Sequence, residues 1–379
     1  MHLADIIGIG RTAAGEHWRR SLVDLCVEAG GAALDEARGT TPTAVIVGNA
    51  LGGVLGDQQN LALYAASRLG LERVETHTVA DDEASGGSAV RVALALLAAG
   101  LHERVLVIGA EKTTDALPDG VEAARAKGLD AVREAGFGMG PSVGAALAMR
   151  RYIDEHRVDR DLFYHLAATA HAHAALNPLA FLSWPLPEEQ YRCSPVVAEP
   201  FTVCDGAPLC DGAAAVVLAR PSQRASSAIR IAGSSAVSCR PGIAGLAVDL
   251  SLPAAERSAA AALSQAGLAA RDVSVFELHD SSTLMAALSV EAVGLAPRGK
   301  ALDFAARGGL RIGGERPALT FGGLKARGHV MGAAGVCQIA EGALQLRGEA
   351  GTNQVAGAKS ALVQCLGSLG ATAVTHVLA

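Results

Sequence analysis

The segment VADDEASGGSAVRVALALLAAG at Val79–Gly100 places three acidic residues and a Gly/Ser turn ahead of a long apolar helix pattern. The strand pattern RVLVIGAEK follows it at Arg104–Lys112. The second half of the chain repeats this order, because MGAAGVCQIAEGALQL at Met331–Leu346 precedes the strand pattern ALVQCLG at Ala361–Gly367. Helix and strand patterns that recur in the same order indicate an internal duplication.

Two further pairs of elements extend the duplication. A helix is expected at Ser21–Glu36 before a strand at Ala44–Ala50. The second half repeats this pair with a helix near Ala254–Ala266 and a strand at Val273–Asp280. Strands that alternate with helices favour largely parallel, buried sheets with helices on both faces. The sequence therefore predicts an α/β protein.

The length of the chain predicts two core-forming halves. At 379 residues it exceeds the size at which a single hydrophobic core usually stops growing. We expect an N-terminal half at 1–222 and a C-terminal half at 223–379, because ARPSQRASS at Ala219–Ser227 is polar and breaks the apolar pattern. The stretch at about 113–199 contains most of the aromatic residues, several histidines and many prolines. It is predicted to be an insertion, or lid, over the site that the two halves form.

Composition excludes several classes of protein. The net charge is −6 and the basic residues are scattered, so no nucleic-acid partner is expected. The N-terminus has an acidic Asp5 and too short an apolar run for a secretion signal or a membrane span, which favours a cytoplasmic protein. The seven cysteines form no CxxC pair and no histidine stands at metal-ligand spacing, so neither a disulfide framework nor a metal is expected.

Four short segments contain candidate functional residues. The acidic run ending at Glu83 either caps the helix that follows or contributes to a site. His329, in GGLKARGHVMGAAG, is the counterpart of Glu83 in the second half, and duplicated elements would bring the two helix N-termini together. Cys365 and Gly367 lie on a strand-to-turn segment, where a cysteine is often only a packing residue.

These segments resemble the motifs of thiolases of the sterol-carrier-protein type, which include acetyl-CoA acetyltransferase-like and lipid-transfer-protein-like members. Such enzymes carry a Cys-Ala-Ser-Gly-Gly nucleophile turn, a His-Asp or Asn-Glu segment, a Gly-His-Pro segment, and a Cys-x-Gly or His-Asn-x-Gly turn. The corresponding segments here are EASGG at Glu83–Gly87, HDSS at His279–Ser282, GHV at Gly328–Val330 and CLG at Cys365–Gly367. The resemblance implies the thiolase fold, in which duplicated βαβαβαββ halves form a five-layer αβαβα sandwich.

The resemblance also implies a role for each candidate residue. Glu83 stands where the nucleophilic cysteine is expected, and His329 matches the residue that accepts the proton of that cysteine. Cys365 matches the residue that moves the α-proton of the second substrate, and His279 matches the one that holds a water or the thioester oxygen. Backbone N–H groups of Glu83 and Gly367 match the oxyanion hole, which presents donors where negative charge develops.

Glu83 changes the chemistry that this resemblance implies. A thiolate is a strong nucleophile, whereas a carboxylate is a weak one whose acyl product is an anhydride, so ordinary ping-pong thiolase chemistry is not expected. Two states of Glu83 are compatible with the sequence. It is either protonated by desolvation and acts as a donor or acid, or ionised and paired with His329 as a general base.

The sequence thus favours an enzyme that makes or breaks a carbon–carbon bond next to a thioester carbonyl without a cysteine acyl-enzyme. Its substrate would be an acyl-CoA or an acyl-carrier thioester, and no cofactor is expected. Two alternatives stay open: a non-catalytic scaffolding subunit of an acyl-CoA complex, and an acyltransferase to a non-thioester acceptor. The resemblance further implies a homodimer and a small zinc-ribbon/OB-fold partner that binds acyl-CoA.

Overall fold

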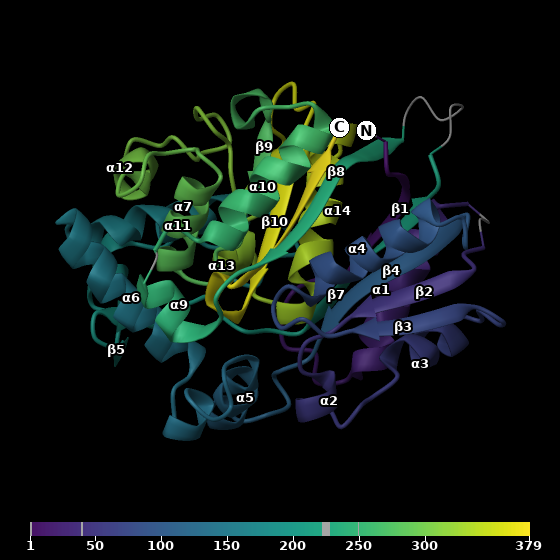
Figure 1. The fold of residues 1–379 in the computed structure, drawn as a ribbon, viewed down its shortest axis with the longest axis horizontal. Coiled ribbons are helices and arrows are strands. Elements are labelled where there is room, and N and C mark those ends of the chain that lie inside the picture. The colour runs from purple at the N-terminus through teal and green to yellow at the C-terminus, as the bar shows by residue number, and fades with distance from the viewer. Residues whose placement is uncertain (1, 39–40, 222–227, 249) are drawn as a thin grey trace.

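The computed structural model describes residues 2–38, 41–221, 228–248 and 250–379. Nine strands form one sheet in the order β3-β2-β4-β7-β1-β8-β11-β10-β9 (Figure 1). The strands of this sheet are β1 (Ala4–Arg11), β2 (Ala44–Gly48), β3 (Glu75–Val79), β4 (Arg104–Glu111), β7 (Gly212–Ala219), β8 (Ile229–Ser238), β9 (Val275–Glu277), β10 (Ala361–Gly367) and β11 (Thr372–Leu378). A separate hairpin pairs β5 (Val196–Ala198) with β6 (Phe201–Thr202).

The α-helices cover the sheet, and two of them lie between its two halves. They are α1 (Leu22–Glu36), α2 (Gly52–Leu55), α3 (Leu61–Arg68), α4 (Ser85–Ala98), α5 (Pro118–Arg125), α6 (Pro141–His156), α7 (Tyr164–Ala174), α8 (Glu188–Arg192), α9 (Gly242–Val248), α10 (Pro253–Ala266), α11 (Thr283–Ala292), α12 (Ala301–Ala306), α13 (Gly323–Arg327) and α14 (Ala334–Arg347). The predicted helix starting at Ser21 is confirmed: Ser21 is the N-cap of α1 and forms a capping box with Asp24.

The strand order confirms the duplication. In the first half, the strands lie in the order third, second, fourth, fifth and first along the chain, from β3 to β1. The second half has the same order in reverse, from β8 to β9. A parallel bridge between Phe276 of β9 and Ala318 takes the place that the pairing of β2 with β3 has in the first half. The two halves join where Ala4–Ile6 of β1 pairs antiparallel with Ile229–Ile231 of β8.

The hydrophobic core confirms the layered α/β arrangement. Helices α1 and α3 cover the outer face of the first-half strands, and α10 and α11 pack on the second half. Helices α4 and α14 lie between the halves, since their core includes Ile46 and Val107 of the first half together with Val275 and Val363 of the second. Apolar side chains therefore hold helices on both sides of the buried strands.

Glycines let α4 and α14 approach each other at their N-termini. A Cβ atom on Gly86 would lie 2.8 Å from the carbonyl oxygen of Gly332, and a Cβ on Gly335 would lie 2.5 Å from the backbone nitrogen of Gly87. Real Cβ atoms do not approach other atoms so closely, so no other residue fits without moving the backbone. This contact brings together the two loops that precede the helices, as the duplication predicted.

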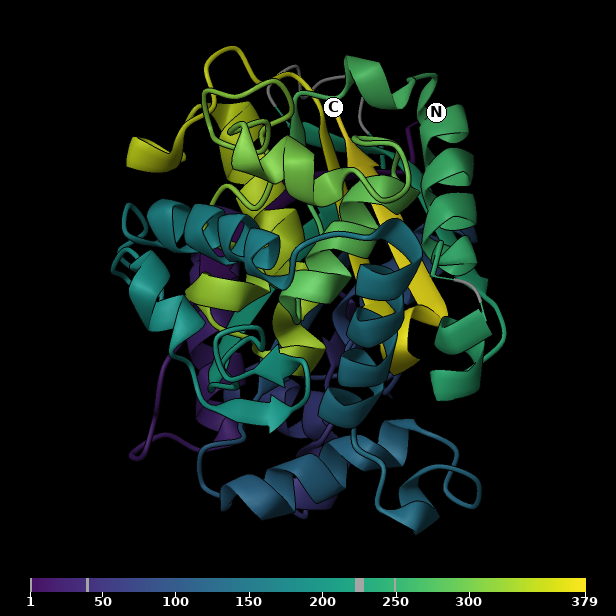
Figure 2. The same ribbon diagram turned by 90° about the vertical axis from the view of Figure 1, so that its left-hand side faces the viewer.

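The predicted insertion packs against both halves. Helices α6 and α7 contact elements of the second half, including α9, α11 and α13, and α5 contacts α2 of the first half (Figures 1 and 2). The predicted division at 222/223 falls in 222–227, outside the described residues. Strand β7 ends at Ala219 and β8 begins at Ile229. In the described parts of the chain, no helix is both long and apolar enough to cross a membrane.

Adding a methyl group at the α4–α14 contact tests this packing. Gly335→Ala is expected to lower the free energy of unfolding by about 1–3 kcal/mol, because an added methyl in a filled core forces neighbouring atoms apart. Gly53→Ala is the control, since nothing lies within 4 Å of its Cβ position. Urea unfolding measures both variants, and equal stability of Gly335→Ala and the unmodified protein would contradict the close contact.

Candidate functional site

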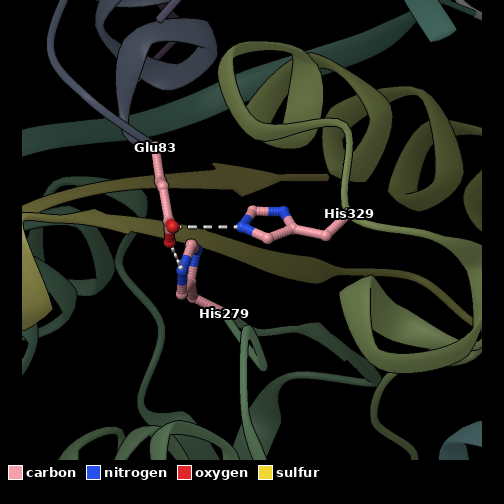
Figure 3. A group of neighbouring side chains, drawn as sticks. All are labelled: Glu83, His279 and His329. Carbon is pink, nitrogen blue, oxygen red and sulfur yellow. Dashed lines mark hydrogen bonds and ion pairs between the residues drawn. The ribbon is translucent and has the colours of Figure 1, made fainter. Parts of the chain in front are cut away.

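Three loops bring Glu83, His279 and His329 together (Figure 3). Glu83 lies two residues before α4, His279 follows β9, and His329 lies between α13 and α14. The Nε2 atom of His279 is 2.9 Å from Glu83 Oε2, and Nε2 of His329 is 3.2 Å from Glu83 Oε1. All three side chains are buried. The structure therefore assembles three of the five predicted site residues through their side chains.

The acidic run does not cap the helix that follows it. The N-cap residue of α4 is Ala84, which has no side-chain capping bond. The Asp81 carboxylate accepts a hydrogen bond from the Ser88 hydroxyl (2.5 Å), and Asp82 accepts one from the Ser368 backbone N–H (2.7 Å). The capping interpretation is wrong because these carboxylates bind other partners, and Asp82 links the two halves of the chain.

The proton on His279 is fixed by the backbone. The N–H of Leu366 donates to His279 Nδ1 at 3.2 Å. A backbone N–H can only donate, so Nδ1 carries a lone pair and the proton of the neutral ring sits on Nε2. His279 therefore donates its Nε2–H to the Glu83 carboxylate. A neutral histidine suffices for this hydrogen bond.

Arg125 is the site residue that the sequence did not indicate. It stands at the end of α5 in the insertion, and its Nη2 atom lies 3.1 Å from Glu83 Oε1. Its Nη1 atom lies 3.0 Å from Glu122 one helical turn earlier. No repeat or motif includes α5, and only the tertiary structure shows that this arginine reaches Glu83.

The contacts around Glu83 favour its ionised form. Burial favours the neutral carboxyl, but His329, the hydrogen bond from His279 and the charge of Arg125 outweigh it, so the pKa of Glu83 lies well below its ordinary value. Burial also lowers the pKa of His329, although the negative charge of Glu83 acts to raise it. A neutral His329 attracts Glu83 less than a charged one would, whereas Arg125 is always charged. We therefore assign the ionised state of Glu83 to Arg125 and His279.

A neighbouring carboxyl behaves differently. Burial, reinforced by the charge of Glu83, raises the pKa of Asp82 to about 6. Two adjacent carboxyl groups thus have pKa values shifted in opposite directions, and only Glu83 contacts a guanidinium. A separation of this kind is a common property of acid–base sites.

A pocket opens beside Glu83 and His279. Its lining comes from both halves and from the insertion: Asp82, Glu83, Arg125, Gly128, Leu129, Pro141, Ser142, Ala145, Phe201, Gly206, Ala207, His279, Ser281, Ser282, Met285, Leu366, Ser368, Leu369 and Gly370. His329 is not part of this lining, although its Nε2 atom lies 3.2 Å from Glu83 Oε1. The lining among the described residues contains no cysteine.

Cys365 and Gly367 lie next to this pocket and are not part of its lining. The Cys365 sulfur is 3.8 Å from the Ala84 carbonyl oxygen and packs where a Cβ on Gly87 would fall. Burial raises the pKa of the Cys365 thiol to about 12. The Cα of Gly367 faces the backbone of Asp81, while its neighbours on either side line the pocket. The structure does not bring the Cys365 thiol to Glu83.

Glu83, His279 and His329 are close enough together to raise the question of a metal, because one ligand atom from each lies within 4.8 Å of the others. The chemistry of these three residues does not fit a metal ion. His279 carries its proton on Nε2, the atom that would have to bind the metal, and the Arg125 guanidinium already contacts the carboxylate.

A second pair of histidines, His171 and His173, lies on α7. The Nδ1 atom of each ring is 3.0 Å from a backbone carbonyl oxygen, that of Trp184 for His171 and that of Leu319 for His173.

Comparison with known proteins identifies the family. Residues 4–181 match the thiolase N-terminal domain, and residues 228–379 match the thiolase C-terminal domain-like family. An acetyl-CoA acetyltransferase of Methanothermobacter thermautotrophicus is 33% identical, covering 98% of both chains. Sterol carrier protein 2 of Oryctolagus cuniculus is 30% identical over 98% of this chain and 71% of its own. The chain belongs to the thiolase family.

Solved structures agree with this fold. An Ltp2-ChsH2(DUF35) aldolase structure has a TM-score of 0.84 at 24% identity and covers 99% of this chain and 97% of that chain. Human mitochondrial 3-ketoacyl-CoA thiolase has a TM-score of 0.76 at 18% identity and covers 100% of this chain and 99% of its own. At these identities the similarity establishes the architecture, and it confirms the predicted thiolase fold.

The buried position of Cys365 predicts its reactivity. Iodoacetamide at pH 8 is expected to alkylate exposed Cys193 and to leave Cys365 unmodified in the folded protein, because the thiolate is the reactive form. Peptide mass spectrometry measures both sites, and denatured protein is the control in which Cys365 should react. Alkylation of Cys365 at the rate of Cys193 would contradict the described packing.

Proposed function

We propose that this protein is a thiolase-like enzyme that makes or breaks a carbon–carbon bond next to a thioester carbonyl, with Glu83 in place of the nucleophilic cysteine. One observation carries the proposal: a buried carboxylate, contacted by the guanidinium of Arg125 and the Nε2–H of His279, lines the pocket. The substrate is an acyl-CoA or acyl-carrier thioester. No cofactor is part of the proposal.

The surroundings of Glu83 favour a base over a nucleophile. Both of its oxygens are engaged, one by His279 and the other by Arg125, which leaves little freedom for the carboxylate to attack a carbonyl. A carboxylate in this position can still accept a proton from a substrate hydroxyl in the pocket. Acid–base catalysis without a covalent intermediate is the chemistry that these contacts support.

In the cleavage direction, the β-hydroxyacyl thioester gives its hydroxyl proton to Glu83. The bond between the α- and β-carbons breaks, the β-carbon leaves as an aldehyde or ketone, and the electron pair moves to the thioester oxygen as an enolate. Backbone N–H groups of Glu83 and Gly367 would stabilise this oxygen. Glu83 then returns the same proton to the α-carbon. Condensation is the reverse sequence.

The two histidines would support Glu83 during this proton transfer. His279 lines the pocket, and its Nε2–H fixes the orientation of the carboxylate. His329 lies within 3.2 Å of the other oxygen, close enough to exchange a proton with it. We assign no role to the Cys365 thiol, because it packs against the Ala84 backbone.

The test is cleavage of a panel of β-hydroxyacyl-CoA thioesters, followed by mass spectrometry of the products. Glu83→Gln is expected to lower kcat/KM by about 10²–10⁴-fold, the usual contribution of a general base. Glu315→Gln, at an exposed carboxylate away from the pocket, is the matched control. Intact-mass measurement should find no acyl adduct. An acyl group on Glu83 or on a cysteine would refute the non-covalent mechanism.

A scaffolding role is the second candidate, and one observation favours it. Arg125, His279 and His329 surround Glu83 so closely that the cluster resembles a structural ion pair. The same assay separates the two functions. Activity of an assembled acyl-CoA complex that does not change in Glu83→Gln would assign the chemistry to a partner. Formation of an amide or aryl ketone from an added acceptor would instead indicate the third candidate, an acyltransferase.

A small zinc-ribbon/OB-fold protein that binds acyl-CoA is the partner that we propose. The aldolase of similar fold is an Ltp2-ChsH2(DUF35) protein, whose name joins two components. The pocket beside Glu83 would receive the thioester end of a substrate. Co-purification with a DUF35-type protein encoded nearby would test this association.

We also propose a homodimer formed through β3. This strand is the edge of the first half of the sheet, and its residues are exposed or half-buried in the described structure. Pairing of two β3 strands is expected to give a particle of twice 38.4 kDa in light scattering.

Two separate substitutions, Thr76→Pro and His77→Pro, test this pairing. Each removes one backbone N–H, and consecutive N–H groups of a strand point to opposite edges. The variant that loses the outward N–H should be a folded monomer, and the other should lose its pairing with β2. A monomeric unmodified protein would contradict the dimer.

A further inference from the structure

Arg125 belongs to the inserted segment, outside the duplicated core, and yet it contacts the central carboxylate of the site. We propose that Arg125 is a positioning residue that keeps Glu83 ionised and aimed at the pocket. This inference rests on the proposed function, in which Glu83 is the base. It assigns to the insertion a part in the chemistry as well as the task of covering the site.

The geometry of Arg125 restrains Glu83 from one side. One nitrogen of its guanidinium contacts Glu83 at 3.1 Å, and the other contacts Glu122 at 3.0 Å. The side chains of Arg125 and Glu83 are only 14% and 12% exposed, so water screens their attraction weakly. Glu122 holds the guanidinium at the end of α5, and the planar fork leaves Arg125 little freedom to turn away.

Arg125 is the one permanent cation paired with Glu83 among the described residues. His279 donates a hydrogen bond as a neutral ring, because Leu366 N–H occupies its other nitrogen. His329 lies at 3.2 Å, but neither of its ring nitrogens makes a hydrogen bond in the described structure. Without Arg125, the negative charge of Glu83 would be stabilised only by two histidines, and neither needs a positive charge to occupy its position.

The remaining charges around Glu83 oppose its ionisation. Asp82 is its neighbour in the chain, and Glu122 shares Arg125 with it. Burial also favours the neutral form of Glu83. Removal of Arg125 would leave only the contacts with His279 and His329 to oppose these unfavourable effects. The pKa of Glu83 would then rise, by about 1–3 units for the loss of one opposite charge at this distance.

The sign of the pH effect follows from this rise. With Arg125 present, the base form of Glu83 persists through neutral pH and is lost only as the pH falls through its lowered pKa. With Arg125 replaced by a neutral residue, the base form would be lost at a higher pH. The acidic limb of the kcat/KM profile should therefore move towards neutrality, while activity at alkaline pH recovers in part.

The experiment compares Arg125→Gln, Arg125→Lys and Arg133→Gln in the full chain. Arg125→Gln should move the acidic limb upwards by about 1–3 pH units, and Arg125→Lys should move it less because the charge is kept. Arg133→Gln, at an exposed arginine of the same segment that does not pair with Glu83, is the matched control and should leave the limb in place. Circular dichroism and thermal unfolding establish that each variant is folded.

A second measurement does not depend on catalysis. Carboxyl ¹³C resonances of glutamate-labelled protein report the titration of Glu83, whose signal is the one absent from Glu83→Gln. An unchanged titration of this signal in Arg125→Gln would overturn the proposed role of Arg125. A shifted titration in a protein that cleaves no thioester would support the role of Arg125 and refute the proposed function. The two proposals can therefore fail separately.

Discussion

The close contact between the N-termini of α4 and α14 is the constraint on which the rest of the structure depends. Gly86 and Gly335 allow backbone to meet backbone where any side chain would separate the two halves. The residues that precede these helices, Glu83 and His329, are brought within 3.2 Å of each other as a consequence. A duplicated chain thus produces one site between its halves, with different residues in the two equivalent positions.

Buried carboxylates reinforce the same interface. Glu111 accepts hydrogen bonds from the backbone N–H groups of Ala50 in the first half and Gly332 in the second. Burial raises its pKa to about 7, even though these N–H donors favour the charged form. Asp82 makes an equivalent link to Ser368. The loops around the site are held by hydrogen bonds across the interface as well as by apolar packing.

The charge of Glu83 and its burial away from water together define the chemistry of the pocket. A carboxylate away from water would ordinarily take up a proton, and Glu83 avoids this because a guanidinium and an imidazole N–H contact it. Because these contacts lower its pKa, Glu83 is present in the base form at every pH above that lowered value, although it holds a proton less strongly than a hydrated carboxylate does. Arg125 of the predicted insertion lines the pocket and contacts Glu83, so the role proposed for it would couple this segment to the charge of the site.

The sequence by itself determined the duplication, the α/β layers and the placement of Glu83 beside His329, because helical periodicity and repeated glycine turns are local properties of the chain. It also selected His279, through its motif. Only the tertiary structure decided three other matters. Arg125 reaches Glu83 from an insertion with no repeated pattern, and the thiol of Cys365 points into the α4 packing since strand residues alternate between two faces. The ionisation of Glu83 depends on atoms about 3 Å away that are distant in the chain, and no local pattern encodes such distances.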